Sequence, residues 1–173
     1  RQRNKRFRAR LRHAALTKMP IRLTRGRVKH NRSMKRVCVT DRSLILPNLP
    51  DELSGLRIIH LSDLHVGELL SPDRLGDIVQ SVNQLEGDLI AVTGDYLDLS
   101  VNVLDEVIDA LKQLAAPLGT YFVLGNHDYL DDGQQVIQAF RDAKLNLLVN
   151  EQVHVTHENK RIQLAGIDWA SKP

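Results

Sequence analysis

Three short clusters of acidic, histidine and amide side chains each follow a run of apolar residues. The clusters are Asp63-Leu64-His65, Gly94-Asp95-Tyr96-Leu97-Asp98 and Gly125-Asn126-His127-Asp128. Carboxylates and imidazoles gathered in one place would repel one another or lose their charge unless a cation neutralised them, because like charges at short range raise each other's pKa. If the clusters meet in the fold, the sequence predicts a site for divalent metal.

The donor types narrow the choice of metal and of reaction. They are oxygen and imidazole donors, without a thiolate from the chain's single cysteine, Cys38. This mixture suits Mn, Fe or Zn better than an ion that prefers thiolate. Two such ions about 3.5–4 Å apart, bridged by a carboxylate, could hold an attacking hydroxide and stabilise the leaving oxygen of an in-line displacement. The chemistry indicated is phosphoester hydrolysis.

The apolar runs before the clusters have the length and composition of buried strands. They span residues 56–61, 88–93 and 120–124, are rich in β-branched or aromatic residues, and end in turn residues. Apolar positions at helical spacing lie between them, within residues 75–85 and 103–114. Strands alternating with helices predict an α/β fold with right-handed crossovers, a largely parallel sheet and helices on its faces. The carboxyl ends of the strands then share one edge, where such sheets bind ligands, and all three clusters fall there.

These residues, in this order, resemble the calcineurin-like metallophosphoesterases. The family signature runs Asp-x-His, Gly-Asp-x-x-Asp and Gly-Asn-His followed by Asp or Glu, and the resemblance covers roughly residues 44–168. It implies a two-sheet α/β sandwich with helices on the outside and two divalent metal ions between the sheet edges. It also implies an enzyme, a hydrolase of phosphodiesterase or pyrophosphatase type in which metal-bound hydroxide attacks phosphorus.

The resemblance gives four residues a role as metal ligands. It makes Asp63 and His65 ligands of the first metal and Asp95 the carboxylate that bridges both metals. It makes Asn126 a ligand of the second metal through its amide oxygen.

Other residues of the motifs are implied to be catalytic or supporting. His127 would contact the phosphoryl group or protonate the leaving oxygen, and Asp98 would orient and charge that imidazole, a pair typical of general acids. Asp128 is expected to fix the loop, and Gly94 and Gly125 are expected to let the backbone turn sharply.

The chain departs from the family pattern after the third motif. A complete member adds a lone His and then a Gly-His-x-His segment, and neither is present before Pro173. His154 and His157 lie in an alternating segment that predicts a β-hairpin with residues 161–164, so we expect partly exposed strand histidines and not ligands. Because the chain begins at Arg1 and stops where the family's second half would start, we expect a fragment that holds mainly the first sheet.

The subfamily is indicated less specifically. Residues 57–65 and 164–168 look most similar to a bacterial, often membrane-associated branch of phosphodiesterases and of pyrophosphatases acting on nucleotide-linked lipid precursors. A protein phosphatase is disfavoured because that branch resembles Gly-Asp-x-x-Asp-Arg-Gly, whereas Leu99 and Ser100 follow Asp98 here. No pair of aromatic residues is evidently placed for base stacking, and the substrate stays open.

Charge divides the chain into two parts. Residues 1–36 hold 15 Lys and Arg and no Asp or Glu, leaving 9 basic and 21 acidic residues in the remainder. This predicts a disordered or surface-bound basic arm, followed by the N-terminal portion of a phosphoesterase domain at residues 37–173. Anionic lipid headgroups would attract the arm, each basic residue contributing about 1 kcal/mol near a membrane. Nucleic acid is the less favoured partner, and a solvated tail without a specific partner is the other interpretation.

Composition and apolar segments indicate a folded core and the expected location of the protein. With 173 residues, of which 42% are hydrophobic, the chain can bury a core. The given residues contain no signal-peptide pattern and no apolar stretch of the roughly 18 residues that a membrane-spanning helix needs, so we expect a cytoplasmic protein or one peripheral on the cytoplasmic membrane. A segment before Arg1 could have carried an anchor. Residues 37–50 alternate apolar and polar side chains and contain two prolines, which predicts an edge strand. His60, in mid-strand, is expected to be packed or half-exposed.

A different class of function also fits the sequence. The chain could be a catalytically inactive scaffold or binding module that docks on anionic membrane or nucleic acid through the basic arm. In that case the polar residues after the strands would only cap helices.

Overall fold

The computed structural model of the chain describes residues 37–68 and 70–169, together with the single positions Leu11, Met19 and Leu23. The predicted arm, residues 1–36, therefore lies outside the described residues apart from those three positions.

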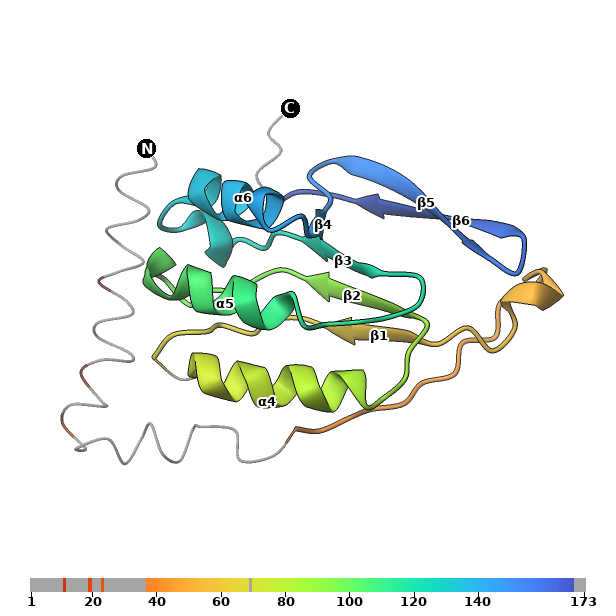
Figure 1. The fold of residues 1–173 in the computed structure, drawn as a ribbon, viewed down its shortest axis with the longest axis horizontal. Coiled ribbons are helices and arrows are strands. Elements are labelled where there is room, and N and C mark those ends of the chain that lie inside the picture. Colours follow the sequence, from red (N-terminus) through yellow and green to blue (C-terminus); the bar gives the residue numbers. More distant parts are fainter. Residues whose placement is uncertain (1–10, 12–18, 20–22, 24–36, 69, 170–173) are drawn as a thin grey trace.

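A parallel sheet forms the centre of the described part (Figure 1). Its strands follow one another in chain order, each parallel to its neighbour: β1 (Ile58–Leu61), β2 (Leu89–Thr93), β3 (Thr120–Val123) and β4 (Asn146–Leu147). Three helices connect the strands and cover one face of the sheet: α4 (Pro72–Asn83), α5 (Leu104–Leu111) and α6 (Gly133–Asp142). The predicted α/β fold with a parallel sheet is confirmed, and the carboxyl ends of the strands share one edge.

Local sequence signals explain where two of these helices begin. The Ser71 hydroxyl accepts a hydrogen bond from the N–H of Arg74 at 3.3 Å, and Pro72, which needs no N–H partner, occupies the first helical position of α4. The carboxylate of Asp132 accepts from the N–H of Gln135 at 3.1 Å and caps α6 in the same way. Each cap satisfies an otherwise unpaired donor at the start of the helix.

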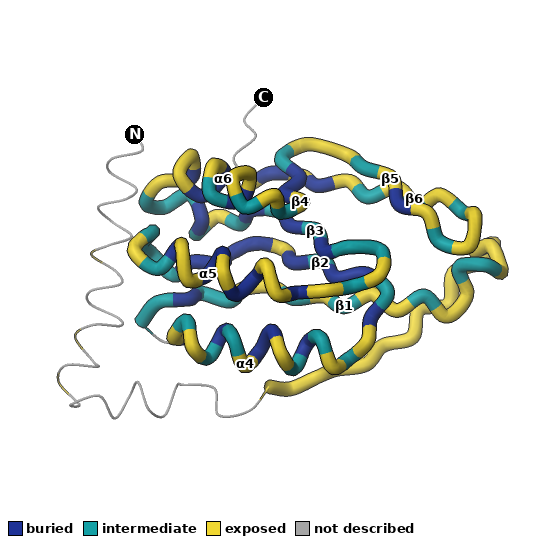
Figure 2. Tube along the Cα trace, in the orientation of Figure 1, coloured by how far each residue is buried: buried dark blue, intermediate teal, exposed yellow. Residues whose placement is uncertain are grey.

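The hydrophobic core lies between the sheet and its three helices (Figure 2). The rings of Tyr96, Phe122 and Phe140 meet at its centre, with centroids 4.9–6.3 Å apart. Full burial of a large apolar side chain contributes about 1.5–3 kcal/mol, so this layer holds the strands firmly in register. On the opposite face, Ile58 is 57% exposed and Thr93 is also exposed.

An antiparallel hairpin follows the parallel sheet. Its strands are β5 (Glu151–His157) and β6 (Lys160–Gly166), and they are joined by Glu158 and Asn159, whose φ angles of 45° and 68° suit a tight hairpin turn. A salt bridge of 3.1 Å from Lys160 to Glu52 ties the hairpin tip to the short 3₁₀-helix η2 (Asp51–Leu53). The predicted hairpin is confirmed.

The prediction of an edge strand at residues 37–50 is wrong. The segment is exposed throughout and is not assigned to any strand. Pro47 and Pro50 have no N–H to donate, and Asn48 between them has a φ of 65°, which interrupts an extended conformation. The sequence did not predict helix α6 or the two-residue strand β4.

Among the described residues, no helix is both long enough and apolar enough to cross a membrane.

Candidate metal centre

The loops after β1 and β2 run side by side at the carboxyl edge of the sheet. The N–H of Asp63 donates to the carbonyl of Gly94 at 3.1 Å, and the N–H of His65 donates to the carbonyl of Asp95 at 2.9 Å. The pairing continues to Val66, whose N–H donates to the Tyr96 carbonyl at 2.8 Å. The parallel pairing of the two strands thus extends into their loops and carries the first two motifs to the same place.

Three residues of these loops have left-handed backbone conformations. The φ angles are 55° at Asp63, 45° at His65 and 54° at Asp95. Such a conformation is uncommon for residues other than glycine and costs on the order of 1–3 kcal/mol unless the surroundings enforce it. Here the main-chain hydrogen bonds between the two loops enforce it, and non-glycine strain of this kind gathers at functional sites.

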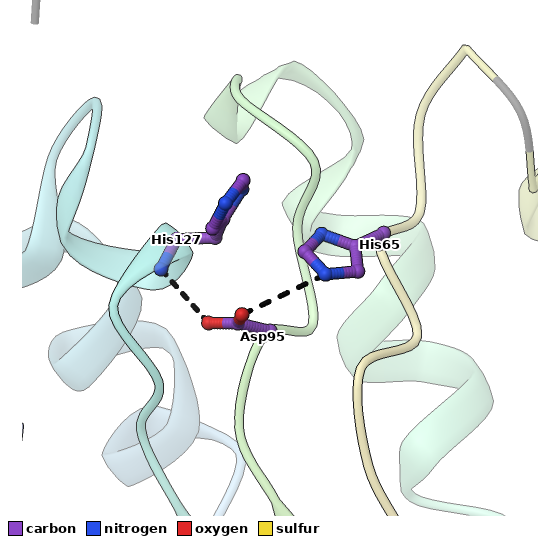
Figure 3. Close-up of side chains that lie close together, drawn as sticks. All are labelled: His65, Asp95 and His127. Atoms are coloured by element: carbon purple, nitrogen blue, oxygen red, sulfur yellow. Dashed lines mark hydrogen bonds and ion pairs between the residues drawn. The ribbon is translucent and has the colours of Figure 1, made fainter. Parts of the chain in front are cut away.

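Side chains from all three motifs converge around Asp95 (Figure 3). The His65 Nε2 atom lies 3.6 Å from Asp95 Oδ2 and 3.7 Å from Asp63 Oδ1. Donor atoms of His65, Asp95 and His127 all lie within 4.8 Å of one another. The rings of the two histidines meet edge to face, with centroids 4.5 Å apart.

These separations fit a shared metal ion. The nitrogen–oxygen distances from His65 are those of ion pairs and exceed hydrogen-bond length. Two ligands each about 2.1 Å from one ion lie about 3.0–3.4 Å apart at ordinary coordination angles, so adjustments of a few tenths of an ångström would suffice. The set of imidazole and carboxylate donors suits Mn, Fe or Zn.

Asp95 also lines a pocket to which neither His65 nor His127 contributes. The pocket has a volume of about 350 Å³, and the lining residues include Asp63, Asn126, Asp168 and Trp169 besides Asp95 itself. Asp63 and Asn126 are exposed, whereas Asp95 is 9% exposed. Asp95 therefore belongs both to the histidine cluster and to the pocket that holds Asn126, which is the position a bridging carboxylate would need.

Asp98 lies beside His127 and accepts a hydrogen bond from the His127 ring through its main-chain carbonyl. His127 Nδ1 lies 2.7 Å from the carbonyl oxygen of Asp98, whereas the sequence prediction paired the ring with the carboxylate. A carbonyl oxygen can only accept, so Nδ1 carries a hydrogen and Nε2 is the nitrogen left to bind metal or phosphate. The main-chain N–H of His127 also donates to Asp95 Oδ1 at 2.8 Å.

Asp128 joins the loops that follow β2 and β3. Its carboxylate accepts main-chain N–H hydrogen bonds from Asp95, Tyr96, Leu97 and Gly125 at 2.8–3.2 Å, and the residue is 1% exposed. Burial raises the pKa of Asp128 to about 6, so the carboxylate is mostly ionised at neutral pH. Asp128 fixes the loop, as predicted, but its bonds to the other loop could not be foreseen.

The two motif glycines allow close approach of these loops. Gly94 has a φ of 81°, and a Cβ there would lie 2.3 Å from the nitrogen of Gly125, so the predicted sharp turn is confirmed. Gly125 has no positive φ, so its role does not depend on a left-handed conformation. A Cβ on Gly125 would instead lie 2.1 Å from Asp95 Oδ1, so this glycine makes room for the carboxylate at the centre of the site.

Sequence reasoning missed the residues at the end of the hairpin that complete the pocket. The Tyr129 hydroxyl donates to Asp168 Oδ1 at 2.6 Å, and Ile167 and Trp169 line the pocket on either side of Asp168 in sequence. Burial, and then the neighbouring Asp168 carboxylate, raise the pKa of Tyr129 well above its ordinary value. The only sequence signal was the position of Asp168 in a segment that resembles the family, without a role attached.

The other histidines lie outside the cluster. In the part of the chain that the structure describes, His154 and His157 belong to no group of metal-binding side chains. They are exposed and half-buried strand residues, respectively. His60 is exposed, not packed, and its Nε2 lies 2.6 Å from the Thr93 hydroxyl.

Comparisons with known proteins agree with this geometry. The family model for the calcineurin-like phosphoesterases matches residues 56–169. A transmembrane protein with metallophosphoesterase domain from Danio rerio is 34% identical over 134 residues, which cover 75% of this chain and 31% of that protein. An uncharacterized metallophosphoesterase of Helicobacter pylori is 37% identical over 100 residues, covering 58% of this chain and 27% of that protein. The metallophosphoesterase YkoQ of Bacillus subtilis, also uncharacterized, is 33% identical over 146 residues, covering 81% of this chain and 53% of that protein.

The relatives share only part of their length with this chain, and they are not confined to bacteria. The chain spans less than a third of the length of the first relatives, 31% in the fish and bovine proteins and 27% in that of Helicobacter pylori. Relatives occur in animals as well as bacteria, so they do not support the narrower bacterial branch. The three motifs, their meeting at one sheet edge and the match over residues 56–169 show that the chain belongs to the calcineurin-like phosphoesterase family.

Proposed function

We propose that this chain carries metal ligands of the active site of a phosphoester hydrolase of phosphodiesterase or pyrophosphatase type. The observation that carries the proposal is the position of Asp95, between the imidazoles of His65 and His127 and the pocket lined by Asp63 and Asn126. Two divalent ions held there would polarise the phosphoryl oxygens and lower the pKa of bound water, which is the chemistry that phosphoester hydrolysis needs.

Four side chains would hold the ions. Asp63 and His65 would bind the first ion, Asp95 both ions, and Asn126 the second through its amide oxygen. The distances of 3.6 and 3.7 Å from His65 Nε2 to the two carboxylates support the first group. The presence of Asn126 in the pocket that Asp95 also lines supports the second.

His127 would act on the substrate. Its Nδ1–H donates to the Asp98 carbonyl, which fixes the ring orientation and the tautomer. A ring that is also protonated at Nε2 can donate to a phosphoryl oxygen or give its proton to the leaving oxygen, as a general acid does. Asp98 is in this proposal a positioning residue for His127.

The test compares Asp95→Asn with His127→Ala by Mn²⁺ titration calorimetry and by hydrolysis of bis-p-nitrophenyl phosphate. Asp95→Asn should weaken the binding of both ions, at least tenfold, because it removes the shared charge. His127→Ala should bind Mn²⁺ as the parent does and lose about 10²–10⁴-fold in turnover. His154→Ala, which removes an exposed histidine of β5, is the matched control and should change neither. Equal loss of Mn²⁺ in both site variants would contradict the assigned roles.

A second function is supported by the charge of the arm. Residues 1–36 carry 15 Lys and Arg without an acidic residue, and this charge favours docking on an anionic membrane surface. The docked protein would be either an active enzyme at the cytoplasmic membrane or an inactive scaffold. If the protein binds Mn²⁺ and hydrolyses the substrate, it is an active enzyme. If it binds Mn²⁺ without hydrolysis, the scaffold is supported.

A further inference from the structure

We propose that Trp169, together with Ile167, forms a wall of the pocket that selects the organic group of the substrate. Tyr129 holds this wall in place through Asp168. The inference rests on the proposed phosphoester hydrolase function and adds the class of substrate: phosphodiesters that carry an uncharged aromatic group.

Trp169 lies in the same pocket as the candidate metal ligands. The indole is 69% exposed, and it lines the pocket of about 350 Å³ together with Asp63 and Asn126. A phosphoryl group held by ions at those residues would direct its esterified group into this space. Stacking of an aromatic group on such a side chain favours binding, and Ile167, 78% exposed, adds an aliphatic surface to the same wall.

The charge of the pocket disfavours an anionic group at this position. Among the described residues that line it, three are aspartates, Asp63, Asp95 and Asp168, and none is Lys or Arg. The metal ions would offset the charge of the aspartates that bind them, but the described residues of the lining offer no cation for a second phosphate or a carboxylate. An uncharged aromatic group is therefore favoured over a charged one.

A hydrogen-bonded link fixes the wall to the loop that carries His127. Asp168 is 8% exposed, and its Oδ1 accepts from the Tyr129 hydroxyl at 2.6 Å. The N–H of Asp168 donates to Asn150 Oδ1 at 3.0 Å, so the residue before Trp169 is held on two sides. Tyr129 ends the 3₁₀-helix η4 (His127–Tyr129), which places the wall at a set distance from the proposed general acid.

Trp169 also provides a direct readout, because it is the only tryptophan of the chain. With Mn²⁺ present, the fluorescence of Trp169 is followed during titration with phenylphosphonate, methylphosphonate and phosphonoacetate, which differ in the group attached to phosphorus. Phenylphosphonate should change the emission at about tenfold lower concentration than methylphosphonate, and phosphonoacetate should bind most weakly. Equal half-saturation by the phenyl and methyl compounds would overturn the proposal.

Variants then test the wall and its link. In hydrolysis, the ratio of kcat/KM for p-nitrophenyl phenyl phosphate to that for p-nitrophenyl methyl phosphate should fall about tenfold in Trp169→Ala, mainly through KM, and be kept in Trp169→Phe. Tyr129→Phe should lower the same ratio several-fold, whereas a merely structural role would lower both rates together. Ile45→Ala, an exposed aliphatic residue outside the pocket, is the control.

Failure of this inference can be distinguished from failure of the proposed function. Hydrolysis without a phenyl preference, or a preference that Trp169→Ala leaves intact, would overturn the role of Trp169 and leave the hydrolase proposal standing. Binding with a phenyl preference but without hydrolysis would support the role of Trp169 and contradict the hydrolase.

Discussion

Replacing Asp128 by asparagine tests whether a buried carboxylate positions the metal centre. Oδ1 accepts from the N–H groups of Tyr96 and Leu97, and Oδ2 accepts from those of Asp95 and Gly125. Asparagine offers one acceptor oxygen and one NH₂ group. In either orientation, therefore, two main-chain N–H groups would face another donor in place of an oxygen.

The expected loss of stability is the difference between two opposing effects. A buried N–H left without an acceptor costs about 1–3 kcal/mol, so two cost about 2–6 kcal/mol. The substitution also removes a charge whose burial is unfavourable, as the raised pKa of Asp128 indicates, and this relief offsets part of that loss. We expect a net decrease of about 1–3 kcal/mol in the free energy of unfolding, which leaves a typical domain folded.

The effect on metal binding should be larger than this modest destabilisation indicates. Asp95, whose N–H is one of the four donors, has a left-handed φ of 54° and lies at the centre of the site. Without Asp128 that backbone conformation is less firmly held, so we expect the affinity for Mn²⁺ to fall about 10–100-fold, as for other supporting residues of metal sites.

Urea unfolding followed by circular dichroism, and Mn²⁺ titration calorimetry, measure the two effects. Asp109→Asn is the matched control, because it removes the same charge at an exposed position of α5, where the partner is Lys112 at 3.2 Å. The control should stay within about 0.5 kcal/mol of the parent and keep its Mn²⁺ affinity. If Asp128→Asn matched the parent in both measurements, the carboxylate would not position the site.

Three further predictions follow from the contacts and charges. Gly125→Ala should lower Mn²⁺ affinity about 10–100-fold by calorimetry, because its Cβ would lie 2.1 Å from Asp95 Oδ1. The control Gly76→Ala, with open space around it in α4, should leave the free energy of unfolding unchanged or raise it by about 0.5–1 kcal/mol. Tyr96→Phe should lose about 1–2 kcal/mol in urea unfolding, because its buried hydroxyl lies 2.7–2.9 Å from carbonyl oxygens of β2 and β3; an unchanged midpoint would contradict this. Removal of residues 1–36 should abolish sedimentation with anionic vesicles and leave hydrolysis of a soluble substrate unchanged, and continued sedimentation would refute a role for the arm.

The parallel sheet and the meeting of the three motifs could be predicted because one geometric rule connects them. Strands that alternate with helices must run parallel, and parallel strands bring their carboxyl ends to the same edge. The apolar runs predicted β1, β2 and β3 to within two residues at either end. The location of the site therefore required only the strand assignments and not the details of any loop.

Other parts depended on interactions that the residue pattern does not reveal. The segment at residues 37–50 alternates like a strand, but alternation predicts a strand only when a neighbour supplies hydrogen bonds, and two prolines limit that here. Helix α6 has only three large apolar side chains buried, Val136, Ile137 and Phe140, among polar residues, so its periodicity was too sparse to detect. The His127 ring donates its hydrogen bond to a main-chain carbonyl, and main-chain partners cannot be identified from residue type.

The left-handed conformations at Asp63, His65 and Asp95 show how much of the site the main chain prepares. These residues bring strain of about 1–3 kcal/mol each, and hydrogen bonds between neighbouring loops hold them in place. Because the strain is borne on folding, the donor atoms already lie within a few tenths of an ångström of a coordinating arrangement. An ion that binds there needs little further rearrangement. Substitutions that loosen the loop contacts, as at Asp128 and Gly125, should therefore lower metal affinity more than they lower stability, although neither side chain would touch the metal.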